Sequence, residues 1–338
     1  QLDLFPTNIL GGIEIQKSYS PDQLATTTGG SVKIMTKGLP DGRVHKLSGK
    51  LGVNLDFTGD DVLSHRNSET ELFGFDNGLR DLPSGVLEAT NGGTSLTVCD
   101  PAIDPVRCTS QLEAAQLAVK FQDDYNLDEK TAYPDFGLGW ALGDRLPAGT
   151  NEWGYYLALD YDRETSDRGN AELTNPLGTT GEYRRTEVTV ALNGYAVAGY
   201  EYGADNEILS KTSLLRATDH TTRFEQGLDG REETEISSAI LQYVERQFFS
   251  QAVTGHNEFE TDTATHILDW RVAYSRTDRD EPDRRQYSYF NGNLSTSAFE
   301  RRWSELTEDS TDVVVDYTLP LQWGNYNATE IKAGVLWS

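Results

Sequence analysis

Apolar and polar residues alternate strictly from Leu47 to Phe57 in this chain. An extended backbone places the leucines, Val53 and Phe57 on one face, and the charged and polar residues between them on the other. Alternation with a period of two is typical of a β-strand that separates two different environments. About nine segments show the pattern. They are residues 47–57, 136–143, 153–161, 188–203, 208–218, 238–249, 266–275, 313–319 and 331–337.

The connections between these segments differ in length in an ordered way. Those that we expect to be short lie near Leu146, Asp205, Gly255 and Gly324. Long polar connections alternate with them, at residues 58–133, 164–186, 219–235 and 277–310. Transmembrane β-barrels have short turns at one end and long loops at the other, whereas a β-sandwich has no such bias. The sequence therefore predicts an all-β fold, a transmembrane antiparallel β-barrel whose long loops are extracellular.

The first long connection is expected to carry a helix. Apolar residues recur at helical spacing between Leu112 and Phe121, and Ser110 precedes them with Glu113 three residues later. That pair is the signature of a capping box. Such a long stretch without strands is unusual inside a compact domain, so residues 58–133 are better explained as an external loop.

The composition is compatible with a barrel and excludes helical membrane spans. The 338 residues are 37% hydrophobic, with a mean hydropathy of −0.55, and no apolar run approaches the roughly 18 residues of a membrane helix. In a transmembrane barrel only alternate residues face lipid, so the hydropathy signal is weak. The 16 Tyr, 12 Phe and 6 Trp suit strands with aromatic residues at the membrane interfaces.

The net charge of −25 argues against a nucleic-acid partner, because phosphate binding requires basic patches. Two explanations of the acidity stay open: solubility of exposed loops, which we favour, and divalent-cation binding that bridges to lipopolysaccharide. The carboxylates of residues 59–61 and 278–283 could ligate loop Ca²⁺, but neither segment has the EF-hand spacing. We therefore expect no metal site and no cofactor, with loop Ca²⁺ as the alternative.

Two cysteines, Cys99 and Cys108, close a short loop that contains prolines and lacks histidine. Two thiols in that setting predict a disulfide formed in an oxidising compartment. Closing the loop would contribute roughly 2–3 kcal/mol on the chain-entropy model. Two soft ligands are too few for a structural zinc site.

The first forty residues differ from the rest. Two short apolar runs, residues 13–15 and 32–34, flank a polar loop that contains Pro21 and ends at Gly29 and Gly30. This ordered set, followed at once by an alternating strand, resembles the end of the plug domain in TonB-dependent receptors of bacterial outer membranes. The matching residues are Ile13, Glu14, Lys17, Ser20, Pro21, Gly29, Gly30, Val32, Ile34, Thr36 and Lys37.

Two later segments extend the resemblance over nearly the whole chain. One is similar to an element of the long first extracellular loop, with Asn77 where a second Asp is usual; it comprises Gly74, Phe75, Asp76, Gly78, Arg80, Leu82 and Pro83. The other has Thr254 where Lys is common; it comprises Tyr243, Glu245, Arg246, Gly255, His256, Leu268, Asp269, Trp270, Ser275, Pro282, Asp283 and Arg285.

The resemblance implies a function and a domain organisation. Residues 1–40 would be the C-terminal part of an α+β plug domain, and residues 44–338 the first part of a barrel, with about nine of the roughly 22 strands expected for the family. The protein would import a scarce nutrient across the outer membrane of a Gram-negative cell. Siderophores, cobalamin, oligosaccharides and peptides all stay open as substrates. The implied partners are outer-membrane lipid, lipopolysaccharide, the TonB–ExbB–ExbD complex acting through an upstream region, and a surface lipoprotein.

No catalytic constellation is found, since the five histidines are scattered and none has zinc-protease spacing; we expect no enzyme. Loops on rigid scaffolds often carry recognition, so we assign substrate binding to Asp76, Arg80, Arg279, Asp283, Arg284, Tyr287 and Tyr289. The polar face of the first strand is expected to contact the plug, through Lys46, Lys50, Asn54 and Asp56. The alternatives are a passive or structural outer-membrane barrel and a secreted, soluble β-rich binding protein.

Overall fold

The chain is an all-β protein. Its computed structural model describes residues 9–18, 30–99, 102, 109–121, 123–174, 180–230, 233–261, 264–323 and 327–337. Strands make up 69% of the structure and helices 7%, so the all-β prediction is confirmed. None of the helices in the described ranges is long and apolar enough to cross a membrane.

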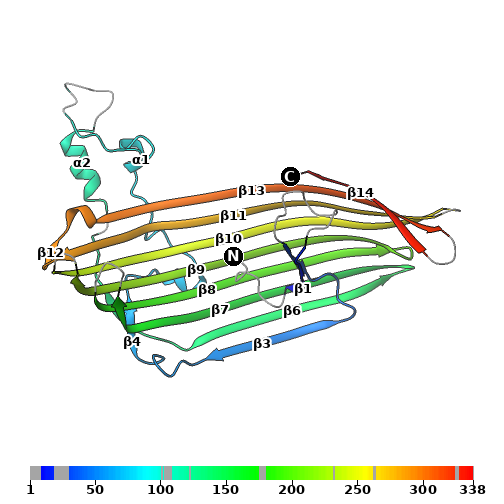
Figure 1. Cartoon of the computed structure of the whole chain (residues 1–338), viewed down its shortest axis with the longest axis horizontal. Helices are drawn as coiled ribbons and strands as arrows, with labels where there is room; N and C mark the ends of the chain where they lie inside the picture. The colour runs from blue at the N-terminus through cyan, green and yellow to red at the C-terminus, as the bar shows by residue number, and fades with distance from the viewer. Residues whose placement is uncertain are drawn as a thin grey trace.

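One large antiparallel sheet dominates the fold, and each long strand pairs with the strands that precede and follow it in the chain (Figure 1). Its strands, in spatial order, are β3 (Val44–Gly52), β6 (Asp135–Ala148), β7 (Asn151–Thr174), β8 (Thr180–Tyr202), β9 (Asn206–Asp229), β10 (Thr234–Glu260), β11 (Thr265–Phe290), β13 (Glu300–Trp323) and β14 (Asn327–Trp337). The short strand β12 (Asn293–Leu294) pairs with the end of β11. The nine long strands correspond to the nine alternating segments of the sequence.

A separate hairpin precedes the sheet. Strands β1 (Leu10–Gln16) and β2 (Ser31–Thr36) pair antiparallel with Ile13 opposite Ile34 and Ile15 opposite Val32, as the two apolar runs predict. The hairpin lies across one face of the large sheet (Figure 1). A buried cluster joins them; it contains Ile9, Ala141, Tyr156, Ala158, Tyr195, Val197, Leu209 and Leu215, with Leu39, Val44 and Phe248 packed against it.

The sheet therefore has two distinct faces. We call the one under the β1–β2 hairpin the hairpin face; Ala141, Ala158 and Tyr195 are direct cross-strand neighbours on it. The other face carries large apolar side chains at the positions in between. Several of these side chains are about half exposed, such as Leu159 at 54%. We call this set the apolar band: Leu138, Trp140, Leu142, Leu146, Trp153, Tyr155, Leu157, Leu159, Tyr161, Leu192, Ile208 and Leu214.

Three of the four predicted long loops are wrong in extent. Strand β7 continues to Thr174 and β8 begins at Thr180, so most of residues 164–186 is strand. The predicted loop at 219–235 is likewise strand up to Asp229 and from Thr234. In 277–310 only residues 291–299 separate β11 from β13. The sequence suggested loops because polar residues occupy both faces of the strands there, and such a strand shows no alternation of apolar and polar residues.

The first long connection is the exception. It contains β4 (Asp61–Ser64), the 3₁₀ helix η2 (Glu69–Phe73), α1 (Val86–Ala89), α2 (Gln111–Ala118) and β5 (Asp128–Thr131). Figure 1 shows α1 and α2 standing clear of one end of the sheet, while β4 lies close to it. The 3₁₀ helix η2 contacts β8. We call residues 53–134 the excursion, and the sheet face that it covers, opposite the hairpin face, the excursion face.

The local predictions for the excursion hold. Ser110 caps α2, and its hydroxyl accepts from the Glu113 N–H while the Glu113 carboxylate accepts from the Ser110 N–H. Cys99 is disulfide-bonded, and Cys108 lies outside the described residues. An isolated bridge between Val98 and Thr109 holds the ends of this cysteine loop together.

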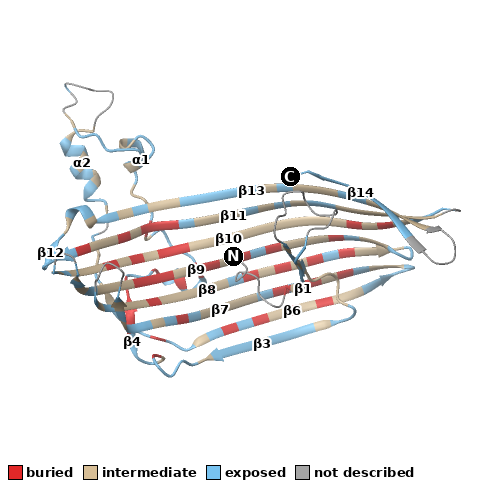
Figure 2. Cartoon of the chain, in the orientation of Figure 1, coloured by how far each residue is buried: buried red, intermediate tan, exposed pale blue. Residues whose placement is uncertain are grey.

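Figure 2 shows that buried residues concentrate in the middle strands, β6 to β10, and in the excursion segment that lies on them, whereas β3 and β14 at the sheet edges are mostly exposed. The core is thus the contact of the central strands with the hairpin on one face and with the excursion on the other.

One glycine allows close packing between neighbouring strands. A Cβ atom at Gly255 would lie 2.2 Å from the Trp270 ring, whereas at Gly194 it would meet only Leu159 at 3.6 Å. We expect Gly255→Ala to lower the free energy of unfolding by about 1–3 kcal/mol through overpacking. Gly194→Ala is the matched control and should be neutral or slightly stabilising. Urea denaturation of both variants in detergent measures the difference; equal midpoints would contradict this packing.

Candidate functional site

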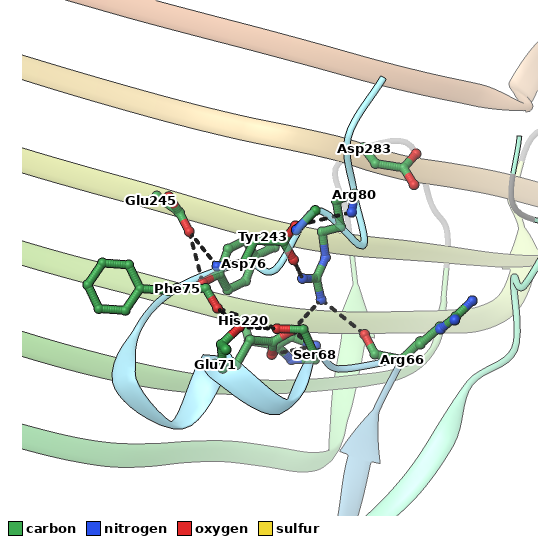
Figure 3. Close-up of polar contacts among 12 residues, drawn as sticks. Arg66, Ser68, Glu71, Phe75, Asp76, Arg80, His220, Tyr243, Glu245 and Asp283 are labelled. Carbon is green, nitrogen blue, oxygen red and sulfur yellow. Dashed lines mark hydrogen bonds and ion pairs between the residues drawn. The ribbon is translucent and has the colours of Figure 1, made fainter. Parts of the chain in front are cut away.

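Arg80 is the centre of a buried charged cluster between the excursion and the sheet (Figure 3). The residue is 5% exposed. Its guanidinium donates to Glu71 Oε1 (2.7 Å), to Asp76 Oδ1 (2.6 Å) and to the carbonyl oxygen of Arg66 (3.0 Å). The same group lies over the Tyr243 ring of β10, 4.3 Å from its centre. One cation thus gathers two carboxylates and fixes residues 66–80 against the strand below.

A second set of contacts ties the same segment to β9 and β10. The Asp76 N–H donates to Glu245 Oε1 (2.9 Å), and Glu245 pairs in turn with Arg216 (2.7 Å). Arg216 donates to the carbonyl oxygen of Gly74 (2.7 Å), and the Phe75 ring covers its guanidinium at 4.2 Å. Charge-assisted hydrogen bonds with both partners held in place are the strongest kind available to such a contact.

Two histidines stack beside this cluster. The His65 and His220 rings are 3.8 Å apart and nearly parallel, and His65 Nδ1 lies 2.7 Å from Thr222 Oγ1. Burial lowers the pKa of His65 well below its ordinary value, and the charge of Arg80 adds to the effect. Burial and Arg80 likewise lower the pKa of His220 to about 3. Both rings are therefore neutral at physiological pH.

Burial raises the pKa of Glu71 above its usual range, although the adjacent Arg80 opposes the shift. The Glu71 carboxylate also accepts from the Ser68 N–H (2.6 Å). Burial likewise raises the pKa of the Tyr243 hydroxyl, so this group stays protonated and can donate to Glu245 (3.2 Å). The titratable groups of the cluster thus keep one protonation state at neutral pH, as is typical of a structural contact.

This arrangement places Asp76 and Arg80 in a structural role. The sequence predicted that they contact substrate, but their side chains are about nine-tenths buried and their polar atoms are engaged within the chain. The structure does bring Arg80 together with a distant predicted residue, Asp283, since both line a small cavity of about 20 Å³. The Trp303 indole also donates to the Arg80 carbonyl oxygen (2.8 Å), which ties β13 to the same segment.

The other predicted recognition residues lie on β11, in a strand where the sequence suggested a loop. Asp283 is 6% exposed and pairs with Arg285 and Arg301, both at 2.6 Å. The Tyr287 hydroxyl donates to the carbonyl oxygen of Tyr125 in the excursion (2.7 Å). Two of the predicted residues thus contact neighbouring elements: Asp283 pairs with Arg301 of β13, and Tyr287 binds the excursion. The third, Tyr289, is partly exposed on the same strand.

Arg279 and Arg284 surround a carboxylate that the sequence analysis missed. Glu281 is 1% exposed and accepts from Gln242 (2.6 Å). Arg279 and Arg302 each approach it to 3.2 Å, and Arg284 to 3.7 Å. A β-bulge interrupts the β11–β13 register between Glu281 and Arg284. Acidic residues in a polar stretch usually indicate solvated loop, so only the tertiary structure identifies this buried one.

The predicted plug-contact residues divide into two groups. Lys46 lines a cavity of about 560 Å³ beside the chain that leaves β2, together with Leu39. Lys50 forms ion pairs with Asp162 (3.5 Å) and Glu164 on the same face of β7.

Asn54 and Asp56 are not on a strand, because β3 ends at Gly52 instead of continuing to Phe57. The Asn54 side chain accepts from the Asp56 N–H (2.9 Å), which favours a turn over further strand. Phe57 folds into a small core with Val62 and Ala132.

A groove of about 730 Å³ lies on the excursion face, next to the charged cluster. One wall is η2, with Leu72 and Phe73, and the other begins at Tyr133; Leu138 and Leu192 of the apolar band form part of its floor. The Tyr161 hydroxyl donates to the Leu72 carbonyl oxygen (2.7 Å) and so holds η2 over the band.

No family model, curated protein or solved structure matches this chain. Among the described residues, no three His, Cys, Asp or Glu side chains are grouped so that they could hold a metal ion. A function must therefore be inferred from the two faces of the sheet and from what packs on each.

Removing the central cation tests the charged cluster. We expect Arg80→Gln to cost about 3–5 kcal/mol, because it leaves two carboxylates buried without their partner. Arg276→Gln is the matched control, since that ion pair with Asp278 is exposed and screened by solvent and should contribute little to stability. Limited proteolysis of residues 66–80 measures the release of the segment; equal cleavage of the two variants would show that Arg80 does not anchor it.

Acidification should loosen the same segment. Both histidines have a lower pKa in the folded chain than the ordinary 6.5, so the folded contact is fully stable above pH 6.5 and loses stability as the pH falls towards 3. Each histidine should contribute about 1.4 kcal/mol per pH unit. The raised pKa of Glu71 acts in the opposite sense, since its contribution is present below pH 4.5 and is lost as the pH rises through its folded value.

Hydrogen exchange at the N–H groups of Gly74 and Asp76, corrected for intrinsic rates, should report this between pH 7 and pH 5. The double variant His65→Gln, His220→Gln should show a flatter pH dependence. A slope that is unchanged in the double variant would rule the histidines out as its source.

Proposed function

We propose that the chain is part of a TonB-dependent receptor of a bacterial outer membrane. Residues 44–338 would form the first part of its transmembrane barrel, and residues 1–40 the end of its plug. The observation that carries the proposal is the arrangement of the sheet: the hairpin packs on a face with charged residues, and the opposite face presents an apolar band at the same level.

The height of the apolar band supports a membrane location. Trp153 and Tyr155 lie at one end of the band on β7, and Tyr161 lies at the other. Eight residue steps at about 3.3 Å correspond to about 26 Å along the strand. For a strand tilted by about 40° this is roughly 20 Å of height, comparable with the roughly 25 Å apolar band of outer-membrane barrels. Aromatic residues at both edges are also expected at membrane interfaces.

The hairpin face at this level cannot face lipid. It carries Asp160 and Asp162 on β7 and Lys211 on β9, between the positions of the apolar band. At the lipid surface of a barrel, a Lys or Arg near the midplane costs about 2–4 kcal/mol, and an Asp or Glu less. An aqueous lumen filled by a plug provides the environment that these residues need, and the hairpin occupies that side.

The sheet has two open edges, β3 and β14, in the part of the chain that the structure describes. Unpaired strand edges are not tolerated within a bilayer. The proposal therefore requires further strands to close the barrel. This agrees with the expectation that the nine long strands are part of a barrel of roughly 22.

The contact of the hairpin with the sheet suits a part that moves. Among the described residues, its contacts include apolar packing around Ile9 and Leu39, the Lys37 ammonium over the Tyr156 ring, and two hydrogen bonds. In these bonds the Tyr195 hydroxyl donates to the Lys37 carbonyl oxygen and Arg145 donates to that of Pro40. Such a plug can be displaced by force from the TonB–ExbB–ExbD complex without breaking the β-ladder. A barrel of about 22 strands without a plug would be an open channel. The nutrient class remains siderophore, cobalamin, oligosaccharide or peptide.

Cysteine scanning along β7 tests the assignment of the two faces. In outer membranes of intact cells, Leu157→Cys and Leu159→Cys should react with a lipid-phase probe and resist an aqueous maleimide, because both side chains belong to the apolar band. Ser166→Cys, at a polar position on the same strand beyond the band, is the control and should react with the aqueous maleimide. A reversed pattern, or equal aqueous labelling at all three sites in a detergent-free soluble protein, would contradict the proposal and favour a secreted β-rich protein.

A further inference from the structure

The groove on the excursion face is lined mainly by apolar side chains that are incompletely covered. Phe73 is 59% exposed, Tyr133 66% and Leu138 50%. Exposed apolar surface gathered in one place usually marks a binding surface. The groove is concave, with η2 as one wall and β8 as part of its floor, so it can enclose a chain-like apolar group.

The position of the groove indicates what covers it. Leu138, Tyr161 and Leu192 belong both to the groove and to the apolar band, at the edge of the band nearest the excursion. Any apolar phase that covers the band therefore continues directly into the groove. In the proposed receptor that phase is the bilayer, and the excursion end of the band is its outer leaflet.

A cation lies at the rim of this groove. The Arg163 guanidinium is 6.0 Å from the centre of the Tyr133 ring, and none of the ion pairs among the described residues involves it. The two acidic residues that line the groove are Glu71, which is paired with Arg80, and Glu69 on η2. A phosphate would therefore be attracted to the Arg163 side and not to η2.

We infer that this groove binds an acyl chain of a phosphorylated glycolipid of the outer leaflet, with a phosphate of the same lipid at Arg163. The inference rests on the proposed membrane location. It assigns a purpose to the charged cluster: Arg80, Glu71 and Asp76 hold η2 over the strands, and η2 with the segment at Tyr133 forms a clip around the chain. The lipid would thereby be held as a fixed part of the receptor surface.

Photocrosslinking in the native outer membrane tests the inference and the proposed function separately. A benzophenone amino acid replaces Phe73 in the groove, Leu157 in the apolar band, or Leu112 on α2, which is exposed and remote from both. Mass spectrometry identifies the lipid attached after irradiation. We expect phosphorylated glycolipid at Phe73, lipid at Leu157 and none at Leu112.

The other outcomes each overturn one claim. Lipid at Leu157 without lipid at Phe73 would overturn the groove inference and leave the membrane proposal intact. No lipid at either site would overturn both. Phospholipid in place of glycolipid at Phe73, or a protein segment in place of lipid, would overturn the choice of occupant. Equal labelling at Leu112 would show that the groove is not selective.

The rim cation is tested on the same background. Arg163→Gln should lower glycolipid crosslinking at Phe73 about fivefold, the effect of losing one basic side chain near an anionic lipid surface, and leave crosslinking at Leu157 unchanged. Arg276→Gln is the control, because it removes the same charge at an exposed arginine that already pairs with Asp278. A loss of equal size in both variants would show that Arg163 has no specific role.

Discussion

A residue in a β-strand can face only one side of its sheet, and this constraint organises the molecule. The nine long strands keep continuous registers through the level of the apolar band, so each row of cross-strand neighbours belongs wholly to one face. A shift by one residue anywhere in these strands would move charged residues such as Asp160 into the apolar band. This alternation of side chains between the two faces determines where the hairpin packs on one face and where the excursion packs on the other.

The two attachments use different physics. The hairpin is held mainly by apolar contacts, with Ile9 and Leu215 almost completely buried. The excursion is held by charge, through Arg80 and Arg216 and their carboxylate partners. Apolar contacts are non-directional and allow displacement, whereas a buried charge network fixes one geometry and is costly to break. In the proposed receptor the hairpin on the luminal side must be able to move, whereas the excursion on the outer side must stay attached to the sheet.

The sequence predicted the features that depend on local pattern. The hairpin, the nine strands, the all-β fold and the helix capped by Ser110 are all recognisable from short segments. Strand ends were not predictable by the same means, since β7 to β13 continue where polar residues occupy both faces.

The charged cluster could be predicted from the sequence only in part. The segment containing Asp76 and Arg80 stood out as a motif, but its burial depends on strands well over a hundred residues later in the chain. Nothing local distinguishes such a polar residue from a solvated one. Glu281 shows the same limit, because its arginine partners come from both sides of a bulge and from the neighbouring strand.

The length of the strands has a consequence for what reaches the protein first. Strand β7 continues from Tyr161 to Thr174, and β10 and β11 have 27 and 26 residues, against about 9–11 that a membrane requires. In the proposed orientation this surplus forms a collar that rises roughly 30 Å above the bilayer, for strands tilted by about 40°. A large ligand, a bacteriophage or an antibody would meet the rim of the collar, beyond the inner sugars of the surface glycolipids. The entrance to the barrel would thus be set by hydrogen-bonded strands of fixed shape, and only to a small degree by adaptable loops.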